Sequence, residues 1–286
     1  MMNLLRMDFY RLIKGRMLWV FLGIIVVVVA LMTVFFAFLH SDAGKDFLMN
    51  SVQDGSGTIV TAGGAVYLDD PADVDAMLTS MFDLTQIEYV TQAFAYGGGM
   101  YILLFLLVVL FCAAEFESGF AKNVFSVRQS KTAFFASKFI LMIVVSVVFL
   151  LFGTALSMLS AAILGIDLRA STPTEWLTWL GLSALVTLAY ELILAAVVWL
   201  VRNKVAGIVL AVMLAVGVIG GLLSWILGFF FGSDALKALL YTGMKATGAG
   251  SAGIEELGVT TIVVVSVIYA VVAIAAGLVA LKKRDV

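Results

Sequence analysis

The amino-acid sequence predicts an all-α membrane protein with six transmembrane helices. Of its 286 residues, 63% are hydrophobic and only 13% are charged, whereas soluble domains are close to half apolar and about a quarter charged. The mean hydropathy is +1.13. So many apolar side chains do not fit into one soluble core, and lipid is therefore the expected solvent for much of the chain.

Six stretches reach the roughly 20 apolar residues that a membrane helix needs. The third and the fifth are longer than a straight crossing requires, which predicts tilt, a kink or a re-entrant end. The six predicted spans are residues 17–39, 92–114, 137–164, 175–200, 205–231 and 258–281.

The basic residues predict how the spans are oriented. Most of the 17 lysines and arginines fall before span one, between spans two and three, between spans four and five, and after span six. Cytoplasmic loops carry such an excess of positive charge. We therefore expect both termini in the cytoplasm of a bacterial cell, with the protein in the plasma membrane. The loop 40–91 is rich in aspartate and is expected to lie outside.

Residues 1–16 are expected to form a helix in the membrane interface, followed by the permease domain 17–286. One side of the helix is apolar and the other carries cations, a pattern typical of helices on acidic lipid surfaces. A topology signal without a folded helix is the alternative. The apolar stripe is Met2, Leu5, Phe9, Leu12 and Ile13, and the polar side is Asn3, Arg6, Arg11 and Lys14.

Short helices are also expected in the outer loops. Asp70 and Pro71 are typical of a helix start, and the apolar residues that follow predict a helix over 70–82. Residues 233–241 show a similar pattern. Thr172 and Glu175 form a predicted capping box at the start of span four, with Pro173 at the first helical position.

The cytoplasmic connection 115–136 contains a second amphipathic helix. Phe116, Phe120, Val124 and Val127 follow helical spacing, while Lys122 and Arg128 lie elsewhere around the helix. An apolar stripe on a short cytoplasmic helix needs a cover, which would be either the membrane surface or a docked protein.

In these features the chain resembles the ABC-2-type permeases, the six-span membrane subunits of bacterial ABC exporters. Such permeases commonly have an acidic residue, a glycine, a basic and apolar helix, and then a basic residue before span three. The chain departs from the usual pattern at Phe120 and Lys131, where threonine and arginine are frequent. The matching residues here are Glu117, Gly119, Lys122, Asn123 and Lys138.

The resemblance implies a coupling helix within 116–131 that docks on a cytosolic ABC ATPase. It also implies a second permease chain, identical or different, and substrate passage between or beside the two. ATP and Mg²⁺ would bind to the partner ATPase, because this chain has no G-x-x-x-x-G-K-[ST] loop. The coupling residues implied are Phe116, Glu117, Gly119, Phe120, Lys122, Asn123, Val124, Val127, Arg128 and Lys131.

Glu191 is the acidic residue that the sequence places well inside a span. An intramembrane carboxylate is a functional candidate, for substrate contact or proton relay. The alternative is a structural hydrogen bond to a neighbouring span, with Thr187, Tyr190 or a serine of another span as partner.

Span five contains two small-residue repeats, which allow close approach of helix backbones. They are expected to serve packing within the chain or a dimer seam. The four residues are Gly217, Gly221, Gly228 and Gly232.

The sequence shows no catalytic residues and no cofactor or metal site on this chain, so we expect a non-catalytic subunit with no nucleic-acid partner. The first alternative function is a membrane sensor, scaffold or immunity protein that transports nothing. A membrane enzyme would need clustered polar residues near one interface, and an ion-driven carrier would favour two similar halves or broken helices. Substrate identity is not predicted beyond a peptide, an antibiotic or a lipid-like molecule.

Overall fold

The computed structural model shows a helical membrane protein. It describes residues 2–53, 58–61, 64–67, 84–95, 99–118 and 131–283. Within these residues, five helices are long and apolar enough to cross a membrane. Each is rich in Leu, Ile, Val and Phe and carries few charges, which is what the hydrocarbon core selects. The five are α2 (Arg16–His40), α6 (Gly99–Glu117), α8 (Lys131–Leu164), α9 (Pro173–Val201) and α14 (Val259–Lys283).

The predicted fifth span is two helices rather than one. α10 (Lys204–Ala215) and α11 (Val218–Phe231) are bent by 59° at a short break, and together they also pass as a membrane span. The break lies at Gly217, whose φ of 82° belongs to the left-handed region that glycine adopts without strain. The kink that the length of this stretch predicted is therefore present. It occurs at Gly217, because glycine can adopt a positive φ.

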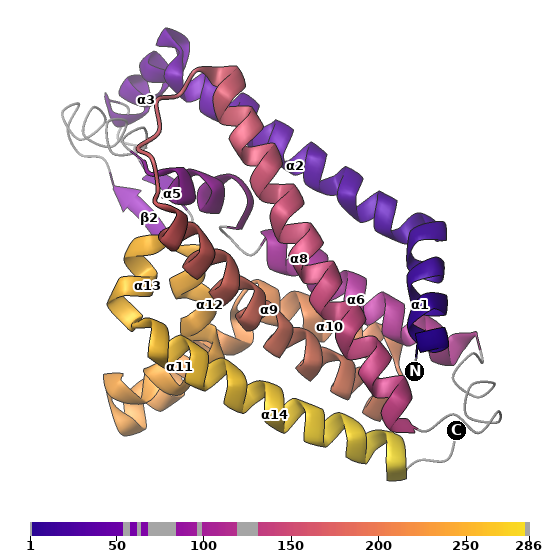
Figure 1. Ribbon diagram of the computed structural model, residues 1–286. Coiled ribbons are helices and arrows are strands. Elements are labelled where there is room, and N and C mark those ends of the chain that lie inside the picture. Colours follow the sequence, from indigo (N-terminus) through magenta and orange to yellow (C-terminus); the bar gives the residue numbers. More distant parts are fainter. Residues whose placement is uncertain are drawn as a thin grey trace.

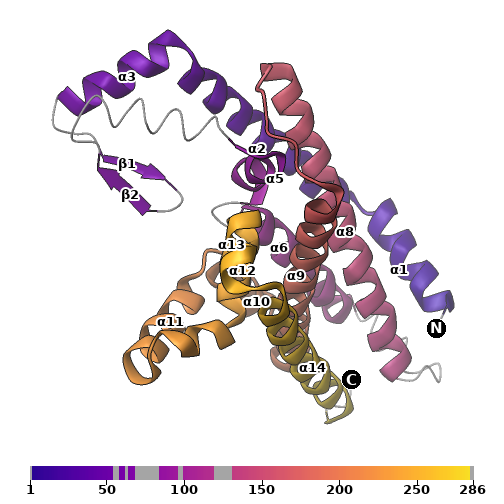
Figure 2. The same cartoon turned by 60° about the vertical axis from the view of Figure 1, so that its left-hand side comes forward.

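α9 lies at the centre of the bundle and packs against α6, α8, α10 and α14. Two of its three tryptophans, Trp179 and Trp199, are fully buried among the neighbouring helices. By contrast, most of the apolar surface of α2 and of α14 is exposed, as expected for helices that face lipid. Figures 1 and 2 show α2 and α8 crossing on one side of the bundle and α11 projecting away from the other side.

α1 (Met2–Lys14) lies at the same end of the bundle as the end of α14 (Figure 1) and packs on α8 and α2. Its buried residues are Leu4, Asp8 and Leu12, of which only Leu12 belongs to the predicted apolar stripe. Met2 and Ile13 of that stripe are exposed. The face that meets the protein contains an acidic residue, and the remaining apolar residues are left for a membrane surface.

The opposite end of the bundle carries short elements. The stretch after α2 contains α3 (Asp42–Gln53) and an antiparallel hairpin of β1 (Thr58–Thr61) and β2 (Gly64–Tyr67), in which Thr58 pairs with Tyr67. The sequence did not predict this hairpin. The predicted helix over 70–82 lies outside the described residues. α5 (Gln86–Val90) lies ahead of the predicted second span 92–114. The first residues of that predicted span belong to a π-helical turn, η1 (Thr91–Ala95), and the membrane helix α6 begins only at Gly99.

The predicted helix over 233–241 is corrected to a 3₁₀-helix, η3 (Ser233–Ala238), followed by α12 (Leu240–Gly248) and α13 (Ser251–Leu257). The change of element occurs at Leu239, which is extended. α12 is fastened to the bundle at its far end, where Thr247 Oγ1 lies 2.9 Å from Tyr101 Oη and the Thr247 carbonyl accepts a 2.9 Å hydrogen bond from Trp179 Nε1.

The predicted capping box at α9 is confirmed. Thr172 Oγ1 accepts from the Glu175 backbone N–H, and the Glu175 carboxylate accepts from the Thr172 N–H. A second capping box, Thr85 with Glu88, starts α5. The two helix starts lie together, because the Arg169 backbone exchanges hydrogen bonds of 3.0 Å with residues 84 and 86.

Candidate functional site

A buried group of charges joins three helices at the end of the bundle that holds α1. We call Asp8, Arg11, Glu115 and Lys138 the ion cluster. Lys138 Nζ donates to Asp8 Oδ1 over 2.6 Å and to Glu115 Oε1, and Arg11 Nη1 lies 3.5 Å from Glu115 Oε1. The side chains of Lys138, Asp8 and Glu115 are at most 1% exposed. Two carboxylates and two cations make the ion cluster neutral.

Aromatic rings complete the surroundings of the Lys138 ammonium. It lies 4.9 Å from the centroid of the Phe111 ring and 5.0 Å from that of Phe134, within the range of cation–π attraction. Ser137 Oγ lies 3.0 Å from Asp8 Oδ2. Carboxylates and aromatic ring faces therefore replace the water molecules that the lysine ammonium loses when it is buried.

The ion cluster is expected to be rigid for energetic reasons. Burying a charge is costly, and mutual attraction offsets that cost only when partners and hydrogen bonds are in place. Moving one member away would leave another charge buried without compensation. The ends of α6 and α8 and the face of α1 that carries Asp8 are therefore expected to move as one body.

The position of the ion cluster along the chain relates it to the predicted coupling segment. Glu115 lies in the last turn of α6 and Lys138 in the second turn of α8, so the two residues flank the stretch 119–130. The end of α6 and the beginning of α8, which flank that stretch, are consequently joined to each other and to α1.

Most of the predicted coupling residues lie outside the described residues, namely Gly119, Phe120, Lys122, Asn123, Val124, Val127 and Arg128; Lys131 begins α8. Phe116 is half-buried, with the Arg202 guanidinium 5.4 Å above its ring. Glu117 is exposed and lies 3.5 Å from Lys204 Nζ. These two contacts link the end of α6 to the turn between α9 and α10. Lys138, which matches the basic residue before span three in the permease pattern, belongs to the ion cluster.

Sequence reasoning missed Asp8, Arg11 and Glu115 as site residues. It singled out Glu191 as the acid well inside a span, whereas Glu115, one residue beyond the predicted second span, is equally buried. The available signal was Asp8, the acidic residue in an otherwise basic helix, together with Glu115 and Lys138 at the borders of two spans. No sequence spacing connects residues 130 positions apart.

Glu191 lies fully buried between α8 and α9. Its Oε1 accepts a 2.8 Å hydrogen bond from Ser146 Oγ, while Oε2 has no hydrogen-bond partner among the described residues. A serine of another span is therefore the partner. Thr187 instead donates to the Ser183 carbonyl, and the Tyr190 ring packs against Phe105. This geometry favours a role in joining α8 to α9.

The four glycines of the predicted fifth span do not form one close-packing surface. Gly217 and Gly232 have positive φ and end helical segments. A Cβ on Gly221 would have no neighbour within 4 Å, and one on Gly228 would meet only Leu236 at 3.8 Å. Close approach occurs at Gly217 and at Gly220, both of which lie against the Tyr241 ring; Gly220 was not among the predicted residues. Both predicted repeats fall on α11, with Gly217 and Gly232 at its two ends, and the predicted dimer seam stays a prediction.

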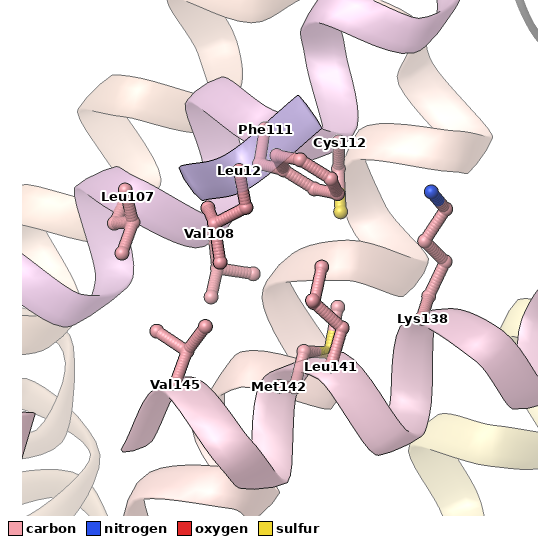
Figure 3. Close-up of a pocket in the computed structure, with 9 residues that line it drawn as sticks. All are labelled: Leu12, Leu107, Val108, Phe111, Cys112, Lys138, Leu141, Met142 and Val145. Atoms are coloured by element: carbon pink, nitrogen blue, oxygen red, sulfur yellow. The ribbon is translucent and has the colours of Figure 1, made fainter. Parts of the chain in front are cut away.

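A small cavity of about 20 Å³ lies beside the ion cluster, between α1, α6 and α8. Figure 3 shows its lining to be apolar except for Lys138, whose amine points away from Leu141 and Met142. A water in a buried site needs two or more polar partners, so this cavity is a dry packing gap. Cys112 also lines it, buried among apolar groups, where a thiol behaves as a small hydrophobic residue.

Within the described ranges, no three His, Cys, Asp or Glu side chains gather in a way that would hold a metal ion. The arrangement at the ion cluster is suited to fixing helices relative to one another. No model of a known protein family matches the sequence, and no curated protein matches it.

Proposed function

We propose that this chain is the permease subunit of an ATP-driven ABC exporter in the bacterial plasma membrane. The observation that carries the proposal is that the ion cluster ties the two flanks of the stretch 119–130 to α1. A force applied to that stretch would reach α1, α6 and α8 together. A docked ATPase needs such a connection to change the packing of membrane helices.

The arrangement of the helices supports the same proposal. Counting the bent pair α10–α11 as one span gives six crossings, an even number that agrees with α1 and the end of α14 lying at one end of the bundle. The basic residues assign that end to the cytoplasm. In this proposal a second permease chain completes the transporter, which moves a peptide, an antibiotic or a lipid-like molecule.

The proposal is tested by co-expressing the tagged chain with the ATPases encoded beside it and purifying it in mild detergent. We expect an ATPase to co-purify with the wild type and to be lost with Phe120→Asp and with Val124→Asp. Ser126→Asp, on the polar side of the predicted coupling helix, is the matched control and is expected to retain the ATPase.

The result that would overturn the proposal is a chain that purifies alone under conditions in which the ATPase is soluble and binds ATP. A membrane sensor or scaffold would then be the better interpretation. Loss of the ATPase in all three variants would indicate that the segment is only generally disturbed, and the coupling assignment would be withdrawn.

A further inference from the structure

A second, much larger cavity lies at the opposite end of the bundle from the ion cluster. Its volume is about 570 Å³, and it is lined by residues of α11, η3, α12 and α13 and open on one side. Cavities of roughly 300–1,000 Å³ are typical of small-molecule sites. We call this space the outer cavity. Figure 1 shows these four elements side by side, away from α1.

The outer cavity presents one cation and one anion that are not paired with each other. Lys245 of α12 and Glu256 of α13 both line it, and neither has an ion-pair partner among the described residues. Lys237 also lines the cavity but is paired with Asp234 over 2.9 Å. The charges left to a ligand are thus one positive and one negative, a pattern that complements a zwitterion.

The walls of the outer cavity also bear on the nature of the ligand. Leu236 and Leu257 line it together with the charged groups. Ser224 lines it from α11, whose neighbouring residues Trp225 and Phe229 are more than 70% exposed. Large exposed aromatic side chains on a membrane helix lie against lipid, often at the interface. The cavity therefore adjoins a surface of α11 that is suited to contact with lipid.

We propose that the outer cavity binds the head group of an amine-bearing zwitterionic phospholipid, namely phosphatidylethanolamine. The ammonium lies at Glu256, the phosphate lies at Lys245, and the acyl chains follow the apolar side of α11. Glu256 accepts hydrogen bonds from a primary ammonium, which a quaternary choline cannot donate. This site needs no ATPase, so it is tested on the chain alone and independently of the exporter proposal.

The test is native mass spectrometry of the purified full chain after delipidation and addition of one lipid at a time. The lipids are phosphatidylethanolamine, phosphatidylcholine and phosphatidylglycerol. We expect the wild type to retain phosphatidylethanolamine best. Glu256→Gln should reduce its retention about fivefold, the effect of losing one partly exposed ion pair. Glu255→Gln is the matched control, since the neighbouring Glu255 does not line the cavity.

Two further variants separate binding from folding. Gly221 lines the outer cavity, and a Cβ there would meet nothing within 4 Å, so Gly221→Leu adds bulk to the cavity wall from an open position and should reduce retention. Gly23→Leu, at an equally open position on α2, should retain the lipid. Lys245→Gln should reduce retention of both phosphatidylethanolamine and phosphatidylglycerol.

Equal retention of the three lipids by the wild type would overturn the proposal. So would undiminished retention by Gly221→Leu, or an equal loss in Glu255→Gln. In a last measurement, soluble glycerophosphoethanolamine is added to the delipidated chain in place of a lipid. If this free head group binds as tightly as the lipid, the ligand is a soluble zwitterion and the membrane assignment fails.

Discussion

Lys138 Nζ of α8 lies 2.6 Å from Asp8 Oδ1 of α1, although the two residues are 130 positions apart in the chain. Both side chains are buried, so water cannot solvate either charge if the contact is broken. It converts α1 from a separate surface helix into part of the bundle.

Lys138→Met is expected to destabilise the protein by about 3–5 kcal/mol, because Asp8 and Glu115 would remain buried without their cation. The measurement is the free energy of unfolding in mixed detergent micelles. Lys204→Met is the control, since the Lys204–Glu117 pair is exposed and its loss is expected to change stability by less than about 1 kcal/mol.

An apolar replacement of the whole group separates stability from coupling. Asp8→Leu, Glu115→Leu and Lys138→Met together should recover much of the stability lost in Lys138→Met, because no charge is left unpaired. ATPase stimulation in the reconstituted complex should stay low. If stimulation returned fully with stability, the ion cluster would have only a structural role.

Gly217→Ala is expected to destabilise the protein by about 1–3 kcal/mol, since alanine resists a φ of 82° and its Cβ would come within 2.7 Å of the Tyr241 ring. Gly221→Ala, four residues later in a regular helix with open space, should be neutral or slightly stabilising. Thermal unfolding of both variants checks the pair. Equal effects would mean that the bend at Gly217 does not require glycine.

Glu191→Gln is expected to leave the unfolding temperature close to that of the wild type, because an amide oxygen still accepts the hydrogen bond from Ser146 Oγ. Retained ATPase stimulation in the reconstituted complex would agree with the joining role that the geometry favours. A stable Glu191→Gln protein without stimulated turnover would instead identify the carboxylate as functional.

The orientation is tested with single cysteines placed in a Cys112→Ala background, where the one natural thiol has been removed. Asp167→Cys, in an exposed turn at the outer end, should react with a membrane-impermeant maleimide on intact cells. Lys14→Cys should react only after the membrane is permeabilised. The reverse pattern would invert the assignment made from the basic residues.

The fold was largely predictable from hydropathy and caps. Long apolar runs located the ends of most membrane helices closely, but α6 begins at Gly99 instead of residue 92 and α8 at Lys131 instead of residue 137. The capping box at Thr172 fixed the start of α9 because its hydrogen bonds are local. The bend at Gly217 was predictable only as a region, since a glycine in a long apolar run is compatible with both a regular helix and a break. The sequence of the β1–β2 hairpin has no hydrophobic or turn pattern strong enough to distinguish it from the rest of the polar loop.

The candidate site was less predictable than the fold. Helical spacing identifies residues that share a face of one helix, but the ion cluster depends on how α1 docks against α6 and α8. Asp8 looked like an ordinary polar residue in a basic helix, and Glu115 like the border of a span. Only the packing shows that the two carboxylates share one lysine.

The separation of Asp8 and Lys138 along the chain has a consequence for biogenesis. At a synthesis rate of 5–20 residues per second, roughly 6 to 26 s pass between the two residues leaving the ribosome. During that interval α1 has no partner for its aspartate, and its exposed apolar residues are what retain it at the membrane surface. The ion pairs of the cluster therefore form only after α8 has been synthesised and inserted. The docking of α1 on the bundle is then a step that follows the insertion of α8.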